Sequence, residues 1–172
     1  MLYKKLNLDL GSIDFERLKG ESFPFSRSFF EIRIRDWDYL KEILAGKIKF
    51  NIRPDRINVT EIVYPGAHPH VDAWTVALNY YFNTGSEATN FYKVKEDGAK
   101  SKTHRDPSVL VYDLEDLDHI GSFSADVGDC YLLDTKAIHA VRVNSAEAVR
   151  KIMRITWLKG SVEEIYNSLE IL

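Results

Sequence analysis

The feature that most constrains the fold is a run of short strand-like segments between residues 47 and 158, with turn signals about every 8–12 residues. Apolar and polar residues alternate in several of these segments, and pairs such as Pro-Gly, Asp-Gly and Asn-Ser divide them. Because no helical period interrupts the region, alternating strands and helices are disfavoured. The pattern predicts an all-β sandwich or small barrel, and among these a jelly roll, that is, a double-stranded β-helix. The expected strands are 48–52, 57–64, 74–82, 88–95, 108–112, 129–133, 139–143 and 149–158.

Helical patterns lie towards the two ends of the chain. Asp36 can cap the N-terminus of a helix over 36–45, and Gly46 stands where a left-handed residue commonly follows a helix. Near the C-terminus, Ser161 and Glu164 have the spacing of a capping box that opens another helix. We therefore expect a mainly β fold whose outer face is covered by flanking N-terminal and C-terminal helices.

Length and composition fit one globular domain. The chain has 172 residues, of which 45% are hydrophobic and 28% are charged. A chain of this length buries about 70% of its unfolded surface on folding, so it can form a core without disulfides. We expect a single domain over 1–172. Residues 1–56 would form a front of helices and strands, 57–158 the double-stranded β-helix core, and 161–172 the C-terminal helix.

Composition also argues against several function classes. The formal net charge of −3 gives no nucleic-acid or membrane signal, and the single cysteine, Cys130, excludes a disulfide framework. Residues 1–10 lack the continuous apolar core of a signal peptide, and no apolar run approaches the roughly 20 residues of a membrane span. The sequence contains no Gly-x-Ser-x-Gly elbow, phosphate-binding glycine loop or Cys-x-x-Cys pair. We expect a soluble cytoplasmic protein, and its oligomeric state is left open.

The segment 65–74 contains the residues best suited to bind a metal. Residues two apart in an extended strand point to the same face about 6.5–7 Å apart, so His70 and Asp72 project side by side while Val71 points away. His139, which opens a later expected strand, is the best candidate for a third ligand. Two histidines and one carboxylate are the ligand set of non-haem Fe(II) sites that keep positions open for a cosubstrate and dioxygen.

The His-x-Asp pattern is weak evidence alone, because it occurs often by chance. Three further features strengthen it. It follows a Pro65-Gly66 turn at the start of an expected strand, His139 opens another strand, and Arg150 follows His139 by 11 positions (150 − 139) at the start of a third.

At these residues the sequence resembles the iron(II)/2-oxoglutarate-dependent oxygenases. His70-Val71-Asp72, His139 and Arg150 are similar, in this order, to the His-x-Asp…His…Arg pattern of that superfamily. The resemblance covers roughly residues 57–158. Shorter matches to small prolyl-4-hydroxylase-like and aspartyl/asparaginyl-hydroxylase-like members lie at Tyr81-Phe82-Asn83, at 85–91, and in the ending that runs from Gly128-Asp129 past Asp134, His139 and Asn144 to Trp157.

The resemblance implies a cupin-like double-stranded β-helix and a division of labour within it. His70, Asp72 and His139 would hold Fe(II), and 2-oxoglutarate would chelate the iron through its C1 carboxylate and keto oxygen. Arg150 would bind the distal carboxylate, for which the forked guanidinium is well suited. Dioxygen (O2) would take the remaining position. The implied function is a dioxygenase that hydroxylates an unactivated C–H bond and releases succinate and CO2.

The cation that binds 2-oxoglutarate has three candidates on one expected strand. By alternation Arg150 and Arg154 share a face, whereas Lys151 takes the other. Arg150 is preferred, and Arg154 and Lys151 remain alternatives. Tyr81 and Asn79 also share a face, and either is a candidate to hydrogen-bond 2-oxoglutarate.

His68 leaves a second type of metal site open. It has the same parity as His70 and Asp72, although Pro69 can bend the strand, and an exposed or supporting role is preferred. The alternative is a cupin-type metal enzyme that does not use 2-oxoglutarate, with His68, His70 and His139 as ligands. A third interpretation, from another class, is a non-catalytic ligand-binding barrel. The substrate, a small molecule or a peptide, is not determined by the sequence.

Overall fold

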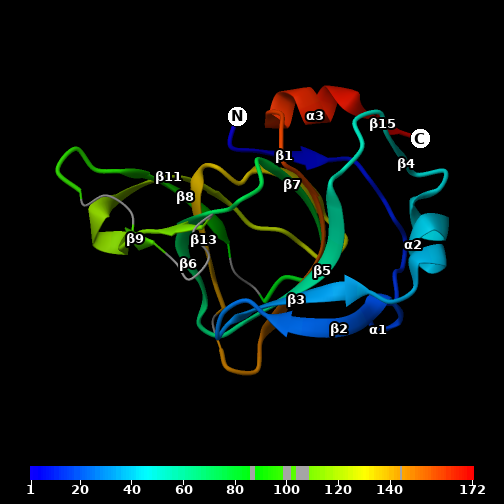
Figure 1. Ribbon diagram of the computed structural model, residues 1–172, viewed down its shortest axis with the longest axis horizontal. Helices are drawn as coiled ribbons and strands as arrows, with labels where there is room; N and C mark the ends of the chain where they lie inside the picture. The colour runs from blue at the N-terminus through cyan, green and yellow to red at the C-terminus, as the bar shows by residue number, and fades with distance from the viewer. Residues whose placement is uncertain (86–87, 99–101, 104–108, 144) are drawn as a thin grey trace.

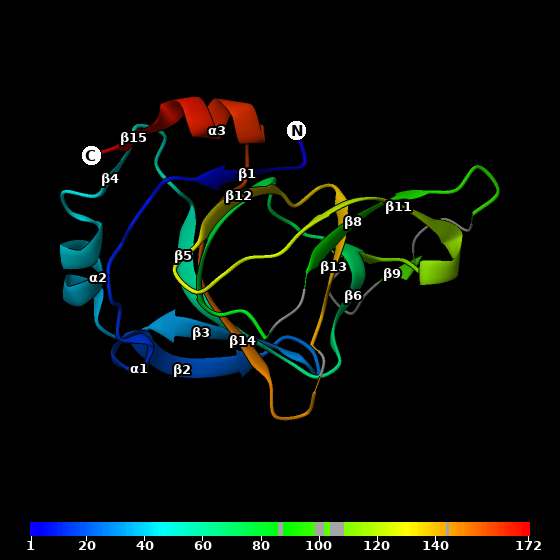
Figure 2. The same cartoon turned by 180° about the vertical axis from the view of Figure 1, so that it is seen from behind.

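The chain folds into a mainly β, double-stranded β-helix of the jelly-roll, cupin-like kind (Figure 1). The structure is a computed structural model that describes residues 1–85, 88–98, 102–103, 109–143 and 145–172. Two antiparallel sheets face each other, and small helices lie on the far side of the larger one (Figures 1 and 2). None of the helices in these ranges has the length and apolar character needed to traverse a lipid bilayer.

The larger sheet contains seven strands among the described residues, and neighbouring strands pair antiparallel. In spatial order they are β1 (Tyr3–Leu6), β12 (Cys130–Asp134), β7 (Val76–Asn83), β14 (Val149–Trp157), β5 (Arg56–Val63), β3 (Phe29–Ile34) and β2 (Lys19–Pro24).

The smaller sheet contains six strands in the same described ranges. Their order is β11 (Leu117–Phe123), β8 (Thr89–Val94), β13 (Ile138–Arg142), β6 (Gly66–Val71), β10 (Leu110–Val111) and β9 (Lys102–Thr103). A 3₁₀ turn, η1 (Leu114–Asp116), precedes β11, and β4 (Ile48–Phe50) pairs separately with β15 (Leu169–Ile171).

The helices cover the outer face of the larger sheet. They are α1 (Phe15–Leu18), α2 (Trp37–Leu44) and α3 (Val162–Ser168). Leu18 of α1, Leu40 of α2 and Ile165 of α3 are almost completely buried, in one cluster with Met153 and Ile155 from the outer face of β14. The apolar stripes of these helices therefore complete a core outside the barrel.

The expected strands of the core each have a counterpart, with ends displaced by one or two residues. The expected strand at 108–112 starts outside the described residues, and β10 covers Leu110–Val111. The caps at Asp36 and at Ser161 with Glu164 are present as expected.

Two local expectations need correction. The front, 1–56, is richer in strands than its pattern indicates, because β1 and the β2–β3 pair extend the two edges of the larger sheet. The C-terminal helix ends at Ser168 rather than running to Leu172, because Leu169–Ile171 pairs with β4 instead. In both cases backbone pairing with a distant segment outweighs the local period.

Gly66, at the start of β6, marks a close approach between two strands. Its φ is +100°, and a side chain there would collide with the carbonyl oxygen of Val141 on β13. Glycine is needed for both reasons. The contact holds β6 against β13, the two strands that carry the candidate histidines.

Candidate functional site

His70, Asp72 and His139 come together at one mouth of the barrel. His70 on β6 lies directly opposite His139 on β13 in the register of the smaller sheet, and their ring centroids are 4.4 Å apart. Asp72 follows the end of β6, where its backbone N–H donates to the carbonyl of Thr135 at 2.9 Å. Sheet pairing thus joins residues that lie 67 positions apart in the sequence (139 − 72).

The three side chains present their ligand atoms to one point. The distance from His70 Nε2 to Asp72 Oδ1 is 3.4 Å, and from His139 Nε2 to Asp72 Oδ2 it is 3.8 Å. One ligand atom from each residue lies within 4.8 Å of the other two. Separations of this size are those of atoms that could bind a single ion.

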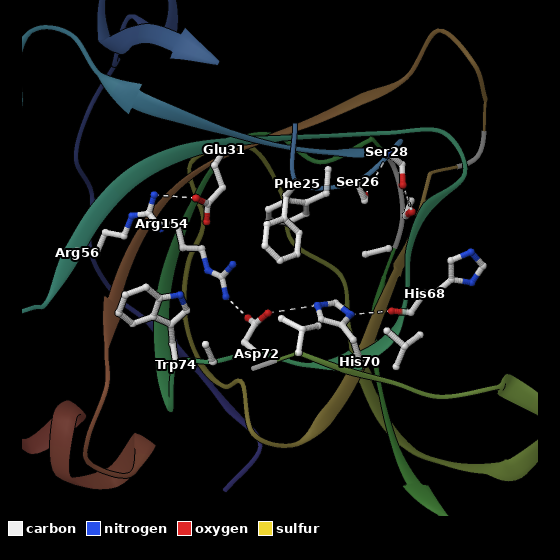
Figure 3. Close-up of a pocket in the computed structure, with 16 residues that line it drawn as sticks. Phe25, Ser26, Ser28, Glu31, Arg56, His68, His70, Asp72, Trp74 and Arg154 are labelled. Carbon is white, nitrogen blue, oxygen red and sulfur yellow. Dashed lines mark hydrogen bonds and ion pairs between the residues drawn. The ribbon is translucent and has the colours of Figure 1, made fainter. Parts of the chain in front are cut away.

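Backbone carbonyls orient both imidazole rings. Nδ1 of His70 lies 2.6 Å from the carbonyl oxygen of His68, and Nδ1 of His139 lies 2.9 Å from that of Ala137 (Figure 3 shows the first contact). Because a carbonyl oxygen can only accept, each Nδ1 is the donor in its contact, and each Nε2 faces Asp72. Such a contact to the second ring nitrogen is the usual way in which a metal-binding histidine is oriented.

Electrostatics favour the protonation states that a metal requires. Burial lowers the pKa of His139 to about 4, so the ring is neutral near pH 7. Burial alone would raise the pKa of the Asp72 carboxyl. The charge of Arg154, together with His70 and His139, outweighs burial and holds that pKa well below its usual range. The site therefore contains a neutral imidazole beside a carboxylate.

His68 does not join this group. Its side chain is exposed, and in Figure 3 its ring points away from His70 and Asp72. The register between β6 and β13 shifts between the pairs His139–His70 and Val141–Ala67, so His68 and Pro69 form a bulge. This extra residue cancels the parity that His68 would otherwise share with His70. Its backbone carbonyl, rather than its ring, accepts the hydrogen bond from His70 Nδ1.

Arg150 lies deep between the two sheets. Only 1% of the residue is exposed, its Nη1 donates to Thr89 Oγ1 at 3.1 Å, and its Nε donates to the Thr84 carbonyl at 3.2 Å. The guanidinium also lies 5.2 Å from the centre of the Tyr81 ring. A fixed, buried guanidinium beside a hydroxyl is suited to bind a carboxylate.

Arg154 and Lys151 lie on opposite faces of β14. Arg154 faces inward and is 7% exposed, and its Nη2 donates to Asp72 Oδ2 in a buried ion pair. Lys151 faces outward, with its Nζ 3.2 Å from Glu16 Oε1 and 3.9 Å from Glu61 Oε1. The alternation of β14 therefore removes Lys151 from the cavity.

Two adjoining cavities share His70, Asp72 and Arg154 in their walls. The inner one, about 40 Å³, is lined by all three candidate ligands and by Arg150 and Arg154. The outer one, about 240 Å³, is lined by His70, Asp72 and Arg154 as well, and Figure 3 shows the residues that line it. His70, Asp72 and Arg154 thus stand where the two cavities meet, and His139 faces the inner one.

Asn79 and Tyr81, the other expected contacts, also line the inner cavity. Tyr81 is 1% exposed, and burial raises the pKa of its phenol. The Oδ1 atom of Asn79 is buried and has no hydrogen-bond partner among the described residues. An unpartnered buried amide oxygen is costly, so it marks a place where a ligand donor would be stabilised.

The sequence patterns missed most of the outer cavity wall. Phe25, Phe29 and Glu31 come from β3 and the turn before it, a segment with no strong strand signal. Arg56 lies beside Glu31 on the same side of the cavity, and Trp74 also lines it (Figure 3). Only the pairing of β3 with β5 brings the front of the chain to the barrel mouth. Of the shorter landmarks, Asn144 and residues 86–87 lie outside the described residues.

The donor set fits Fe(II). Two imidazole nitrogens and one carboxylate oxygen, each on a side chain that is 11–16% exposed, form a site closed on the protein side and open towards the cavities. This is the arrangement that leaves coordination positions for further ligands.

No protein-family model matches the chain, and no curated protein sequence matches it. Similar solved structures include the epimerase SnoN in complex with Fe3+, alpha-ketoglutarate and nogalamycin RO, at 14% identity and a TM-score of 0.47, covering 79% of this chain and 67% of that chain. The ribosomal oxygenase YcfD of Escherichia coli is 14% identical with a TM-score of 0.40, over 86% of this chain and 37% of YcfD. A mutant of the Bacillus subtilis oxalate decarboxylase OxdC is 12% identical with a TM-score of 0.40, over 92% of this chain and 31% of that chain. At such identities the activity has to be inferred from this chain's own residues.

Proposed function

We propose that this protein is an Fe(II)- and 2-oxoglutarate-dependent oxygenase, and that it hydroxylates a C–H bond of a small-molecule or peptide substrate. The observation that carries the proposal is the inner cavity, which His70, Asp72 and His139 share with the buried guanidinium of Arg150. A metal-chelating dicarboxylic acid needs both a ligand set with open positions and a cation at a distance from it.

The three ligand residues would hold Fe(II) through His70 Nε2, His139 Nε2 and the Asp72 carboxylate. The backbone carbonyls of His68 and Ala137 keep the two rings turned towards the ion, so little side-chain entropy remains to be lost on binding. Bound iron supplies the redox chemistry that activates dioxygen, which no amino-acid side chain provides.

Arg150 would receive the distal carboxylate of 2-oxoglutarate. Thr89 and Thr84 hold its guanidinium in place, and the Tyr81 ring lies against it. Asn79 on β7 pairs in register with Arg154 and lines the same inner cavity, where its side-chain amide could donate to the cosubstrate. Because Arg150 is buried, an ion pair between its guanidinium and the distal carboxylate of 2-oxoglutarate would be stronger than the same pair in water.

The decisive experiment is an anaerobic titration of the protein with Fe(II) and then 2-oxoglutarate, followed by visible absorption. We expect a charge-transfer band in the wild-type protein that needs both additions. Arg150→Gln should raise the 2-oxoglutarate concentration required by about 10–100-fold, the worth of a charge-assisted pair. Lys151→Gln is the matched control, because it removes a cation from the outer face of the same strand and should leave the titration unchanged.

Each alternative gives a different result. A flat spectrum with retained iron would contradict the use of 2-oxoglutarate. Iron binding that survives in Asp72→Ala would favour a cupin-type site that uses histidines alone. No iron uptake by the wild-type protein would leave a ligand-binding barrel. If the band appears, admission of oxygen should yield succinate in amounts that depend on both iron and 2-oxoglutarate.

A further inference from the structure

Arg154 is a buried cation to which the proposed function assigns no role. Its side chain is 9% exposed, and it lines both the inner and the outer cavity. Nη2 pairs with Asp72, but Nε is buried and has no hydrogen-bond partner among the described residues. A guanidinium with a desolvated, unpaired N–H is costly unless a ligand engages it.

With a metal bound, the ion pair with Asp72 would no longer satisfy this arginine. The same carboxylate faces both candidate histidines, at 3.4 Å from His70 Nε2 and 3.8 Å from His139 Nε2. If Asp72 gives its charge to a metal, Arg154 loses most of the charge that now balances it. A buried cation without a counter-ion strongly favours an anionic ligand.

Other charges at the outer cavity are already paired. Arg56 Nη2 lies 2.7 Å from Glu31 Oε2, so these two residues balance each other at the rim (Figure 3). The rest of the wall includes the aromatic rings of Phe25, Phe29 and Trp74. Among the described residues, the cavity therefore combines an apolar wall with one guanidinium that needs an anion at its base.

We propose that Arg154 binds the carboxylate of the primary substrate, and that this substrate is a small organic acid with an apolar body. The acid group would meet the guanidinium at the base of the outer cavity, and the body would lie against Phe25 and Trp74. Because Arg154 also contacts Asp72, this anchor would place a neighbouring C–H bond close to the metal ligands. The proposal names the substrate class of the function proposed above and rests on it for the reaction.

The test uses pairs of ligands that differ only in charge. Phenylacetate, benzoate and hexanoate are each compared with the corresponding neutral amide by calorimetric titration of the Zn(II)-loaded protein, with 2-oxoglutarate absent and then saturating. We expect at least one acid to bind about tenfold or more tightly than its amide, as for other charge-assisted hydrogen bonds. Arg154→Gln should abolish this preference, and Lys151→Gln should retain it.

Two further variants keep the test interpretable. Arg154→Lys preserves the charge beside Asp72, so it should fold if Arg154→Gln does not, and it should retain a weaker preference for the acid. Arg150→Gln should weaken 2-oxoglutarate binding but not the preference for the acid. Circular dichroism checks that each variant is folded.

The outcomes separate this proposal from the proposed function. If no acid binds the wild-type protein better than its amide, or if the preference persists in Arg154→Gln, the substrate assignment is wrong. An Fe(II)–2-oxoglutarate band would then still support the oxygenase. If the band is missing but the Arg154-dependent preference is found, the anion site stands and the cosubstrate assignment is wrong.

Discussion

The two faces of the larger sheet contrast sharply. On β14 the outward residues Met153, Ile155 and Trp157 are each at most 1% exposed and pack into the core beneath the helices. The inward face of the same strand carries Arg150 and Arg154, which are also buried, at 1% and 7% exposed. Odd-numbered residues of β14 therefore face the core beneath the helices, and even-numbered residues face the interior of the barrel.

The difference indicates that the outer face stabilises the fold, whereas the inner face provides the polar groups of the candidate site. Each fully buried aliphatic side chain on the outer face contributes about 1.5–3 kcal/mol. On the inner face, buried polar atoms of Thr60, Asn79, Arg154 and Thr156 have no partner among the described residues, and each such atom costs free energy. The inner face therefore gives up stability to keep a polar cavity, as functional sites commonly do.

The largest expected effect is on the outer face. Ile155→Ala should lower the free energy of unfolding by about 2–5 kcal/mol, because Ile155 is fully buried in the core beneath the helices. Urea denaturation measures this loss, and the 2-oxoglutarate titration of the folded variant should be unchanged. A large change in affinity with little change in stability would contradict the division between the two faces.

The next effect is a pH dependence that comes from the inner face. Burial lowers the pKa of His139 to about 4 from 6.5, so between these values the unfolded chain binds a proton that the folded protein excludes. Stability of the metal-free protein should therefore fall as the pH decreases from about 6.5 to about 4, by about 3 kcal/mol at most from this residue.

Denaturation at several pH values measures this dependence. His139→Gln should remove the part of the slope that belongs to His139, whereas His119→Gln, at an exposed position on β11, should not. An unchanged slope in His139→Gln would show that the ring is not held neutral by its surroundings.

The smallest expected effect compares one substitution at two sites on the inner side of the barrel. Thr60→Val removes a buried hydroxyl that has no partner among the described residues, and it should stabilise the protein by about 1 kcal/mol. Thr89→Val removes the acceptor of Arg150 Nη1 and should destabilise by about 1–2 kcal/mol. Thermal unfolding of the two variants measures the sign of each change in stability. If both variants changed stability in the same direction, hydrogen bonding would not be what distinguishes the two sites.

Much of the fold could be predicted from the sequence, because strand period and helix caps depend on neighbouring residues. Alternation places Arg150 and Arg154 on one face of β14 and Lys151 on the other, and the structure has them so. His68 is a position where alternation along a strand predicts the wrong face. The bulge at Pro69 depends on how β6 pairs with β13, and no local pattern specifies it.

Local sequence patterns predicted the approximate limits of most core strands, the capped helices, and which side chains of a strand share a face, but β11 and the limits of β6 were not among the expected strands. These properties follow from backbone geometry over a few residues. The meeting of His139 with His70 and Asp72, the ion pair of Arg154 with Asp72, and the closure of the outer cavity by β3 are properties of the folded barrel. Those contacts depend on sheet pairing between distant segments, whose register is set by the packing of the whole barrel.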